Sequence, residues 1–288
     1  MALTKALLQD GHAVRHMSRS RTPVAGVDVF TWDIPKGHIE SAAVRGVDHV
    51  VHLSGAGIAD KRWTRKRLAV LVESRADAAR LLLRAFKEEG VRPLSFVSAS
   101  GAGCYGAQRS DRIFREEDPI GTDTLGWICK EWEAAADEWG SITRVVKLRT
   151  PMVFSPEGGA LPRLAAPARW GLAAALGSGD QWVPWIHVDD LVLAYRAALE
   201  RTTMEGAYNV CADEQVNNRE LMRAVARTLH RPFFLPPVPG ILLRLVLGEM
   251  SALLLGGSRI SGRKLREAGV RPGYDALVPS LEDCLKGS

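Results

Sequence analysis

Cysteine is scarce in this sequence of 288 residues, and its few occurrences are scattered. Cys104, Cys129, Cys211 and Cys284 form no CxxC pair and no cluster with histidine at zinc-ligand spacing. Their spacing argues against a structural zinc site and against the disulfide framework of a small secreted domain. We expect free thiols in a reducing compartment, and hence a cytoplasmic protein.

Long apolar runs are missing as well. The most apolar stretch, residues 241–255, is interrupted by Arg244 and Glu249 and is too short to span a bilayer. No basic segment followed by an apolar run and a cleavage site opens the chain, so no signal peptide is predicted. We therefore expect no membrane partner.

Charge of one sign does not dominate, since 38 Lys and Arg stand against 33 Asp and Glu. With 46% hydrophobic and 25% charged residues, the composition is typical of a globular protein and excludes a disordered or fibrous chain. The one dense basic run, residues 61–67, is interpreted as a solvated helix start. No recognised nucleic-acid motif accompanies it, so no nucleic-acid partner is expected.

Strand-like and helix-like segments alternate through the first 150 residues. Strands are expected at 13–17, 27–32, 48–53, 94–99 and 142–148, and helices at 2–9, from Thr64 to Gly90, and at 126–139. This alternation predicts βαβ units and an α/β fold with a doubly wound parallel sheet. In such folds ligands bind where the strands end, so the loops after these strands should line one cleft.

Beyond residue 150 the loops become richer in Gly, Pro and Trp, as at 156–159 and 176–182. This change predicts a second, smaller α/β lobe with a helical C-terminal part. We expect a nucleotide-binding core at 1–155, to which about 186–212 return, and a substrate-side lobe made of 156–185 and 213–288.

Short motifs at these loops resemble the extended short-chain dehydrogenase/reductase superfamily of NAD(P)-dependent epimerases and dehydratases. Within it, the chain is similar to an atypical subgroup that ends in its own short C-terminal domain. The matching segments, in the expected order over nearly the whole chain, are Ser18-Arg19, Trp32-Asp33, 52–55, 62–64, Ser74-Arg75, 98–106, 148–150, 158–161, 176–179, 185–191 and 247–250. The resemblance implies a Rossmann-like core.

The chain departs from this superfamily at its start. Members open with a strand and a Gly-rich turn of the GGTGFIG kind, whose backbone N–H groups approach the cofactor pyrophosphate. This sequence begins inside the following helix, without about 15 residues that such a strand and turn require. We expect unpaired backbone groups on both strands that would flank the first strand. A misassigned start or a truncation is one interpretation, and a genuine shortened variant is the other.

The resemblance implies an NADP site. Arg19 follows the second strand of the family fold, where arginine favours the 2′-phosphate of NADP, and the hydroxyl of Ser18 suits a phosphate too. The other cofactor-binding residues that the resemblance implies are Asp33, Leu53, Ser54, Gly55, Arg75 and Val153. The alternatives are a solvated loop arginine for Arg19, a turn cap for Asp33, and a buried ion pair with Glu73 or Asp77 for Arg75.

The catalytic residues of the superfamily are only partly matched. Ser100 fits the position of its Ser/Thr, but the YxxxK pair is absent: Leu125 and Cys129 occupy the two positions. Lys130 lies about 100° around the helix and is no equivalent. Tyr105 and the Cys129 thiol are the candidate substitutes for the proton donor, with packing roles as the alternative.

On the substrate side, we expect Arg149, Gln181, Trp182 and Asn209 to line the cleft beneath the second lobe. Trp and Gln are common in sugar-binding sites and equally common as packing residues. The resemblance thus implies an NADP-dependent oxidoreductase or epimerase-like enzyme acting on a small molecule of the sugar-nucleotide kind, and it allows a homodimer. The alternatives are a non-catalytic NADP-binding sensor or scaffold, favoured by the absent YxxxK, and a truncated cofactor-free form.

Overall fold

The computed structural model of the protein describes residues 1–107 and 109–286. Its α-helices are α1 (Ala2–Gln9), α2 (Arg65–Glu88), α3 (Thr124–Asp137), α4 (Leu161–Arg169), α5 (Val188–Glu200), α6 (Asn218–Thr228), α7 (Gly240–Leu247), α8 (Ala252–Leu255), α9 (Arg263–Glu267) and α10 (Leu277–Lys286). Short 3-10 helices are η1 (Ser41–Ala43), η2 (Ala102–Tyr105), η3 (Glu138–Ser141) and η4 (Gly248–Ser251). Among the described residues, no helix is both long and apolar enough to cross a membrane.

The strands are β1 (Val14–Ser18), β2 (Val27–Asp33), β3 (His38–Ile39), β4 (His49–His52), β5 (Ser95–Gly101), β6 (Arg109–Phe114), β7 (Arg144–Thr150), β8 (Met152–Phe154), β9 (Trp185–His187), β10 (Gly206–Asn209) and β11 (Gly257–Ile260). Their pairings are parallel except between β2 and β3. The strands and helices predicted for the first 150 residues are all present, with their ends shifted by at most two residues.

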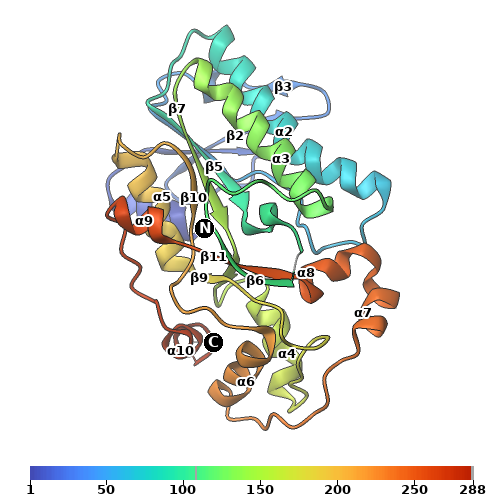
Figure 1. The fold of residues 1–288 in the computed structure, drawn as a ribbon. Coiled ribbons are helices and arrows are strands. Elements are labelled where there is room, and N and C mark those ends of the chain that lie inside the picture. The colour runs from blue at the N-terminus through green and yellow to red at the C-terminus, as the bar shows by residue number, and fades with distance from the viewer. Residues whose placement is uncertain (108, 287–288) are drawn as a thin grey trace.

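The parallel strands form two principal sheets rather than one (Figure 1). The larger has the order β10-β7-β5-β4, and the smaller has the order β1-β2-β3. β4 and β1 are therefore edge strands, and no strand within residues 1–107 and 109–286 pairs with their outer edges. This is the arrangement expected of strands that would flank a missing central strand. The predicted Rossmann-like α/β architecture is confirmed.

Helices α2 and α3 cover one face of the larger sheet (Figure 1). α2 begins where predicted because the side chain of Thr64 accepts the N–H of Arg67 at 3.2 Å. α3 begins at Thr124, two residues before its predicted start, because the carboxylate of Asp123 accepts the N–H of Gly126 at 2.9 Å. The two helices pack against each other through Leu71 of α2 and Leu125 and Ile128 of α3.

The segments beyond residue 150 build a second apolar core. Phe154 of β8 stacks on Trp185 of β9, with ring centroids 4.9 Å apart, and α4, α6 and α10 pack around them. This core is separate from the cluster under α2 and α3. It supports the predicted lobe, whose boundaries stay a prediction.

Candidate functional site

Polar side chains line the buried face of the larger sheet near the carboxyl ends of its strands. Because side chains alternate along a strand, Phe96, Ser98 and Ser100 of β5 share the face that α3 covers. Lys147 and Arg149 of β7 lie beside them, since β5 and β7 pair in parallel with Ser98 opposite Lys147 and Ser100 opposite Arg149. The apolar interior thus gives way to polar groups where the sheet ends.

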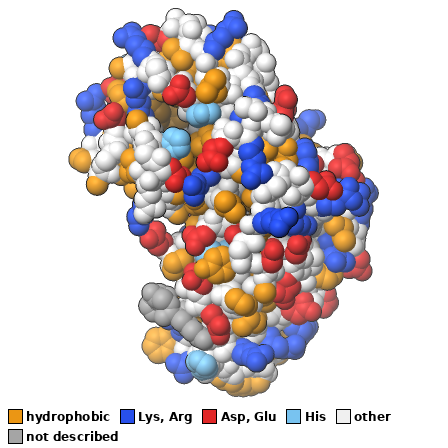
Figure 2. Space-filling model, turned by 90° about the vertical axis from the view of Figure 1, so that its left-hand side faces the viewer, with side chains coloured by type: hydrophobic (Ala, Val, Ile, Leu, Met, Phe, Trp, Pro, Cys, Tyr) orange, Lys and Arg blue, Asp and Glu red, His pale blue; other side chains and the backbone are white. Residues whose placement is uncertain are grey.

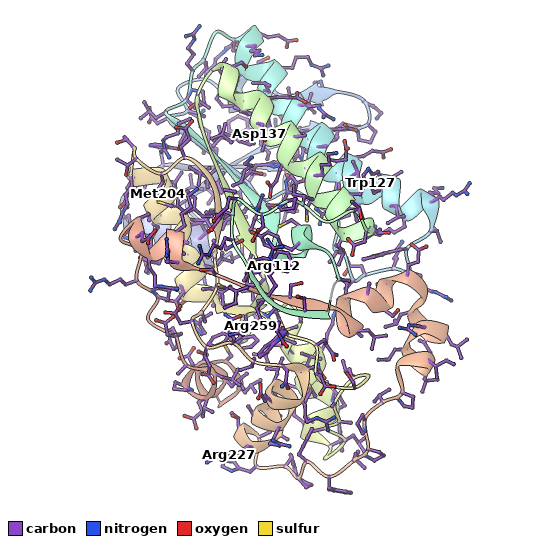
Figure 3. The ribbon with its side chains drawn as sticks, in the orientation of Figure 1. Arg112, Trp127, Asp137, Met204, Arg227 and Arg259 are labelled. Carbon is purple, nitrogen blue, oxygen red and sulfur yellow. The ribbon has the colours of Figure 1, made fainter. Side chains whose placement is uncertain are left out.

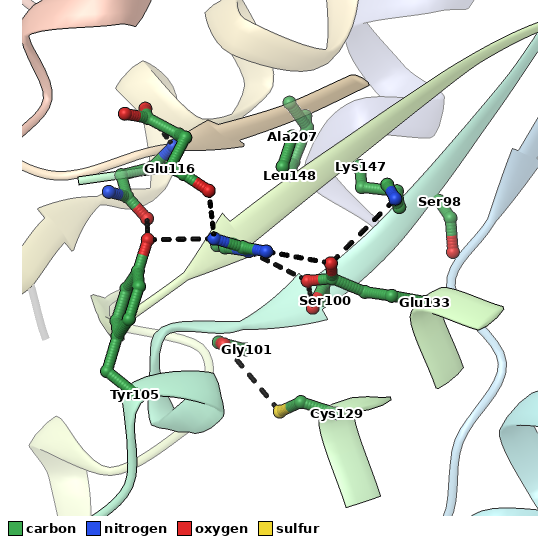
Figure 4. A network of polar contacts seen from close by, with 12 residues as sticks. Ser98, Ser100, Gly101, Tyr105, Glu116, Cys129, Glu133, Lys147, Leu148 and Ala207 are labelled. Atoms are coloured by element: carbon green, nitrogen blue, oxygen red, sulfur yellow. Dashed lines mark hydrogen bonds and ion pairs between the residues drawn. The ribbon is translucent and has the colours of Figure 1, made fainter. Parts of the chain in front are cut away.

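Ser100 and Arg149 belong to a connected network of six polar residues, which we call the polar cluster (Figure 4). Its members are Ser100, Tyr105, Glu116, Glu133, Arg149 and Asn209. Arg149 pairs with Glu133 through two bonds, Nε to Oε1 at 2.8 Å and Nη2 to Oε2 at 2.9 Å. The Ser100 hydroxyl donates to the same carboxylate at 2.7 Å. The hydrogen of Ser100, the predicted catalytic serine, is thus directed at Glu133.

Tyr105 lies at the other end of the polar cluster and is fully buried. Its hydroxyl donates to Oδ1 of Asn209 at 2.8 Å and accepts from Nη1 of Arg149 at 2.9 Å. Burial raises the pKa of this hydroxyl well above its usual range. Tyr105 and Asn209 therefore have buried hydrogen-bond partners within the polar cluster, while proton transfer by Tyr105 and substrate contact by Asn209 stay predictions.

Within the polar cluster, Glu133 and Arg149 compensate each other's charge. Burial alone would raise the pKa of Glu133, but the hydrogen bonds and charge of Arg149 outweigh it, and the pKa is lowered. Burial disfavours the charged Arg149 guanidinium, but its pKa is raised because Glu133 more than compensates. Glu116 holds the backbone, accepting the N–H of Asn209 at 2.7 Å while its carbonyl accepts from Arg149. Glu133 and Arg149 therefore form an ionised, buried salt bridge.

The two positions that would carry YxxxK lie one turn apart on α3 and pack in different apolar clusters, Leu125 with Trp63 and Cys129 with Tyr105. Leu125 and Cys129 are both buried there, and Lys130 is exposed. The Cys129 thiol points at the carbonyl of Gly101, 3.7 Å away (Figure 4). Burial raises the pKa of this thiol to about 12, so it is protonated and unreactive at neutral pH.

Arg75 of α2 is buried without a carboxylate partner. Its Nη1 and Nη2 donate to the carbonyls of Leu71 at 2.8 Å and Ala56 at 3.0 Å. Its guanidinium lies over the ring of Trp132, 4.8 Å from the centroid. The predicted alternative, an ion pair with Glu73 or Asp77, does not form, and Asp77 pairs with Arg80 instead.

Buried polar nitrogens without a partner gather around Arg75. Its Nε and the Nε2 of His52 are both buried and make no hydrogen bond in the described structure. Burial, aided by the charge of Arg75, lowers the pKa of His52 to about 4, so this ring is neutral. Gly55 lies directly against the guanidinium of Arg75, because a Cβ at this position would lie only 2.8 Å from Cζ of Arg75. A buried cation beside a glycine turn is suited to an anionic ligand.

The predicted cofactor-selecting residues lie at the end of β1. Ser18 is half-buried and Arg19 is exposed, and no ion pair of Arg19 occurs in the described part of the chain. Arg21, by contrast, forms an ion pair with Glu40, and its Nη2 lies 2.6 Å from Oε2 of that carboxylate. Asp33 accepts the N–H of Lys36 at 3.2 Å and pairs with its ammonium at 3.0 Å. The turn-cap alternative for Asp33 is therefore realised, whereas Arg19 is free to meet a phosphate.

Three further predicted cofactor residues lie in the loop after β4 and on β8. Leu53 is exposed and Ser54 half-buried just after β4, beside the unpaired edge of that strand. Val153 lies on β8 and packs against the core beneath α5. Their cofactor contacts stay a prediction.

The predicted substrate residues do not converge. Arg149 and Asn209 belong to the polar cluster, whereas Gln181 ties two loops together by donating to the carbonyls of Leu176 at 2.9 Å and Leu254 at 2.6 Å. Trp182 donates to Asp111, and Arg259, labelled in Figure 3, lies over its ring 4.7 Å from the centroid. Sequence reasoning grouped these residues by loop order, and the structure separates them.

A small pocket of about 200 Å³ opens at the N-terminal end of α3. It is lined by Trp63, Asp123, Thr124, Leu125, Glu249 and Ala252. Leu125, at the position of the family tyrosine, thus faces a space that a small ligand can enter.

His187 has a structural role at the start of α5. Its Nδ1 accepts the N–H of Asp189 at 3.2 Å, so the proton is on Nε2, which meets Asp283 at 3.1 Å. Cys284 lies near both side chains. A metal ion would need the Nε2 lone pair, which this tautomer does not offer.

Sequence reasoning missed Glu133, the anion of the polar cluster. A signal was present: Leu125, Cys129 and Glu133 recur every four residues on α3, which places the carboxylate on the buried face. Glu116 had no such signal because it lies in the loop between β6 and α3.

Comparisons with known proteins agree with the geometry. A family model described as the NAD dependent epimerase/dehydratase family matches residues 1–211, and a domain of unknown function (DUF1731) matches residues 238–285. An epimerase family protein of Mycobacterium leprae is 35% identical over 284 residues, covering 97% of this chain and 90% of the relative.

Two solved structures share the fold. The human epimerase family protein SDR39U1 (isoform 2) with NADPH is 28% identical, with a TM-score of 0.89 over 100% of this chain and 95% of that one. The nucleoside-diphosphate sugar epimerase of Corynebacterium glutamicum is 27% identical, with a TM-score of 0.77 over 97% of this chain and 54% of that one. The parallel sheets, the family match over most of the chain and the curated relative agree: the chain belongs to the NAD-dependent epimerase/dehydratase family.

Proposed function

We propose that this protein binds NADP and acts as an oxidoreductase or epimerase-like enzyme on a small molecule of the sugar-nucleotide class. The observation that carries the proposal is Arg75, a buried cation with an unpartnered Nε and no carboxylate partner. The related human protein was crystallised with NADPH, and a related bacterial protein is described as a nucleoside-diphosphate sugar epimerase.

The residues at the carboxyl ends of β1 and β4 fit such a cofactor. Arg75 and the turn at Gly55 would meet its phosphates, and Arg19 with Ser18 would meet the 2′-phosphate that distinguishes NADP from NAD. When bound, NADPH supplies a hydride for a carbonyl or accepts one from an alcohol.

The polar cluster would hold the floor of this site rigid. Glu133 orients Ser100 by accepting its hydrogen, which leaves the Ser100 oxygen as an acceptor for a substrate hydroxyl. Leu125 lines the adjacent pocket with an apolar side chain, which limits the access of water to a bound substrate.

A second function, an NADP-binding sensor or scaffold without turnover, is favoured by one observation. The groups nearest to the family's acid/base positions do not donate a proton readily, since Leu125 has none and the Cys129 thiol has a pKa of about 12. Tyr105 is buried in the polar cluster.

The test separates binding from chemistry. NADPH is titrated into the protein while the fluorescence of its eight tryptophans is followed. An enzyme is expected to bind NADPH and, when NADP+ is supplied, to transfer deuterium to it from the carbinol carbon of one of a panel of deuterium-labelled nucleoside-diphosphate sugars, which become the keto sugars. Tight binding without deuterium transfer would favour the sensor. No binding of NADPH either by this chain or by a form preceded by a strand and Gly-rich turn would overturn both functions.

A further inference from the structure

Helix α7 turns an apolar face to solvent. Ile241 is 70% exposed and Leu245 is 71% exposed, and Leu242 and Val246 are exposed beside them. The spacing of these residues places all four on one side of the helix. α7 lies at the edge of the molecule, away from both sheets (Figure 1). Burial within the protein therefore does not explain why this face is apolar.

The C-terminal end of α7 is anchored to the start of α2. Leu247, at the end of α7, packs in one cluster with Trp63 and Leu68. Next to it, a Cβ at Gly248 would lie 3.1 Å from the guanidinium of Arg62. The apolar face is therefore held beside the basic run of residues 61–67.

That basic run is exposed and unneutralised. Lys61, Arg62, Arg65 and Lys66 are all exposed, and none of them forms an ion pair with another described residue. The nearby Asp60 pairs with Arg163 instead. The face shown in Figure 2 differs, since basic and acidic side chains are intermixed across it.

We infer that α7 and the basic run together form a docking surface for an anionic lipid bilayer. An interfacial helix buries one apolar face at the boundary between headgroups and acyl chains, while neighbouring Lys and Arg meet the headgroup phosphates. α7 carries no acidic residue, and its one charge is Arg244. The protein would lie on the membrane without spanning it, which departs from the sequence-level expectation of no membrane partner.

Two other occupants fit less well. A stable second copy needs about 800 Å² buried on each partner, far more than four partly exposed aliphatic side chains supply. A nucleic acid would meet the basic run but would leave the apolar face of α7 in water. An anionic lipid bilayer, with phosphates at its surface and acyl chains beneath, matches both the basic run and the apolar face of α7.

The test is flotation of the protein with vesicles of phosphatidylcholine alone or with phosphatidylglycerol added. Binding is expected only to the anionic vesicles, and it should weaken with added salt as charges are screened. The double variant Ile241→Ser/Leu245→Ser is expected to lose at least tenfold in affinity. Lys61→Glu/Arg65→Glu is expected to lose more than about tenfold, since each basic residue near an anionic surface contributes about fivefold.

A matched control lies at the amino end of β5. Leu94 is 65% exposed and follows the exposed Arg92, so Arg92→Glu/Leu94→Ser removes the same kinds of side chain elsewhere. This variant is expected to bind vesicles like wild type, with far-UV circular dichroism confirming that all three variants fold. Failure of wild type to float with anionic vesicles would overturn the inference. So would equal loss in the control, or sedimentation equilibrium showing a dimer that only Ile241→Ser/Leu245→Ser breaks.

Discussion

Arg149 and Glu133 form a buried two-bond ion pair between β7 and α3, and both side chains are only 5–6% exposed. Both residues belong to the polar cluster, and their two bonds join α3, the helix that lacks YxxxK, to the carboxyl end of β7. The following expectations come from this pair and from the groups around it.

Replacement of Glu133 by Gln is expected to lower the free energy of unfolding by about 3–5 kcal/mol, because it leaves Arg149 charged and buried without its anion. Urea denaturation followed by tryptophan fluorescence measures this loss. Glu138→Gln is the control, since it breaks the exposed bond to Arg80 and should cost no more than about 1 kcal/mol. Similar losses in the two variants would contradict the burial argument.

His52 is expected to make stability pH-dependent. Its pKa is about 4 in the folded protein and about 6.5 when unfolded, so the unfolded state binds more protons between these values. Stability is therefore full above about pH 6.5 and falls as the pH drops toward 4. Urea unfolding across this range should show a steeper slope for wild type than for His52→Phe, which keeps the ring stacked on Phe96. Identical slopes would exclude a neutral buried His52.

Arg75→Met should separate stability from binding. The variant removes a buried cation with an unpartnered Nε, so the free energy of unfolding is expected to stay within about 1 kcal/mol of wild type or to rise. Loss of charge-assisted bonds should weaken NADPH binding by about tenfold or more. Urea denaturation and fluorescence titration on the same preparation give both values. A variant that binds NADPH like wild type would remove Arg75 from the proposed site.

Gly55→Ala is expected to displace the Arg75 guanidinium, because the added Cβ would lie 2.8 Å from Cζ and 3.1 Å from Nε. We expect a loss of about 1–3 kcal/mol in the free energy of unfolding, together with weaker NADPH binding. Gly158→Ala adds the same methyl group where no other atom lies within 4 Å, and it should change neither value. Thermal unfolding with and without NADPH compares the two, and indistinguishable variants would show that the turn tolerates a side chain.

Much of the fold could be predicted because local signals agree with it. Thr64 caps α2 and the alternation of strands and helices gives parallel sheets, as the structure shows. The unpaired edges of β1 and β4 were also predictable, because both strands would border the strand that the sequence lacks.

The site was harder to predict because its contacts join distant segments. Tyr105 reaches Asn209 across 104 positions of sequence, and nothing local in the sequence indicates that the two side chains bond to each other. Arg75 looked like a member of an ion pair because acids stand near it in sequence, but Asp77 points to Arg80. Glu133 was overlooked although its place on the buried stripe of α3 marks it.

The central claim is that the carboxyl ends of β1 and β4 bind NADP and that Arg19 selects it over NAD. The most direct test compares NADPH and NADH dissociation constants for wild type and Arg19→Glu, in the chain of 288 residues and in a form preceded by a strand and Gly-rich turn. The account predicts that at least one form binds NADPH about tenfold or more tightly than NADH and that Arg19→Glu abolishes the preference. Equal affinities in wild type, or no binding of either nucleotide by both forms, would contradict it.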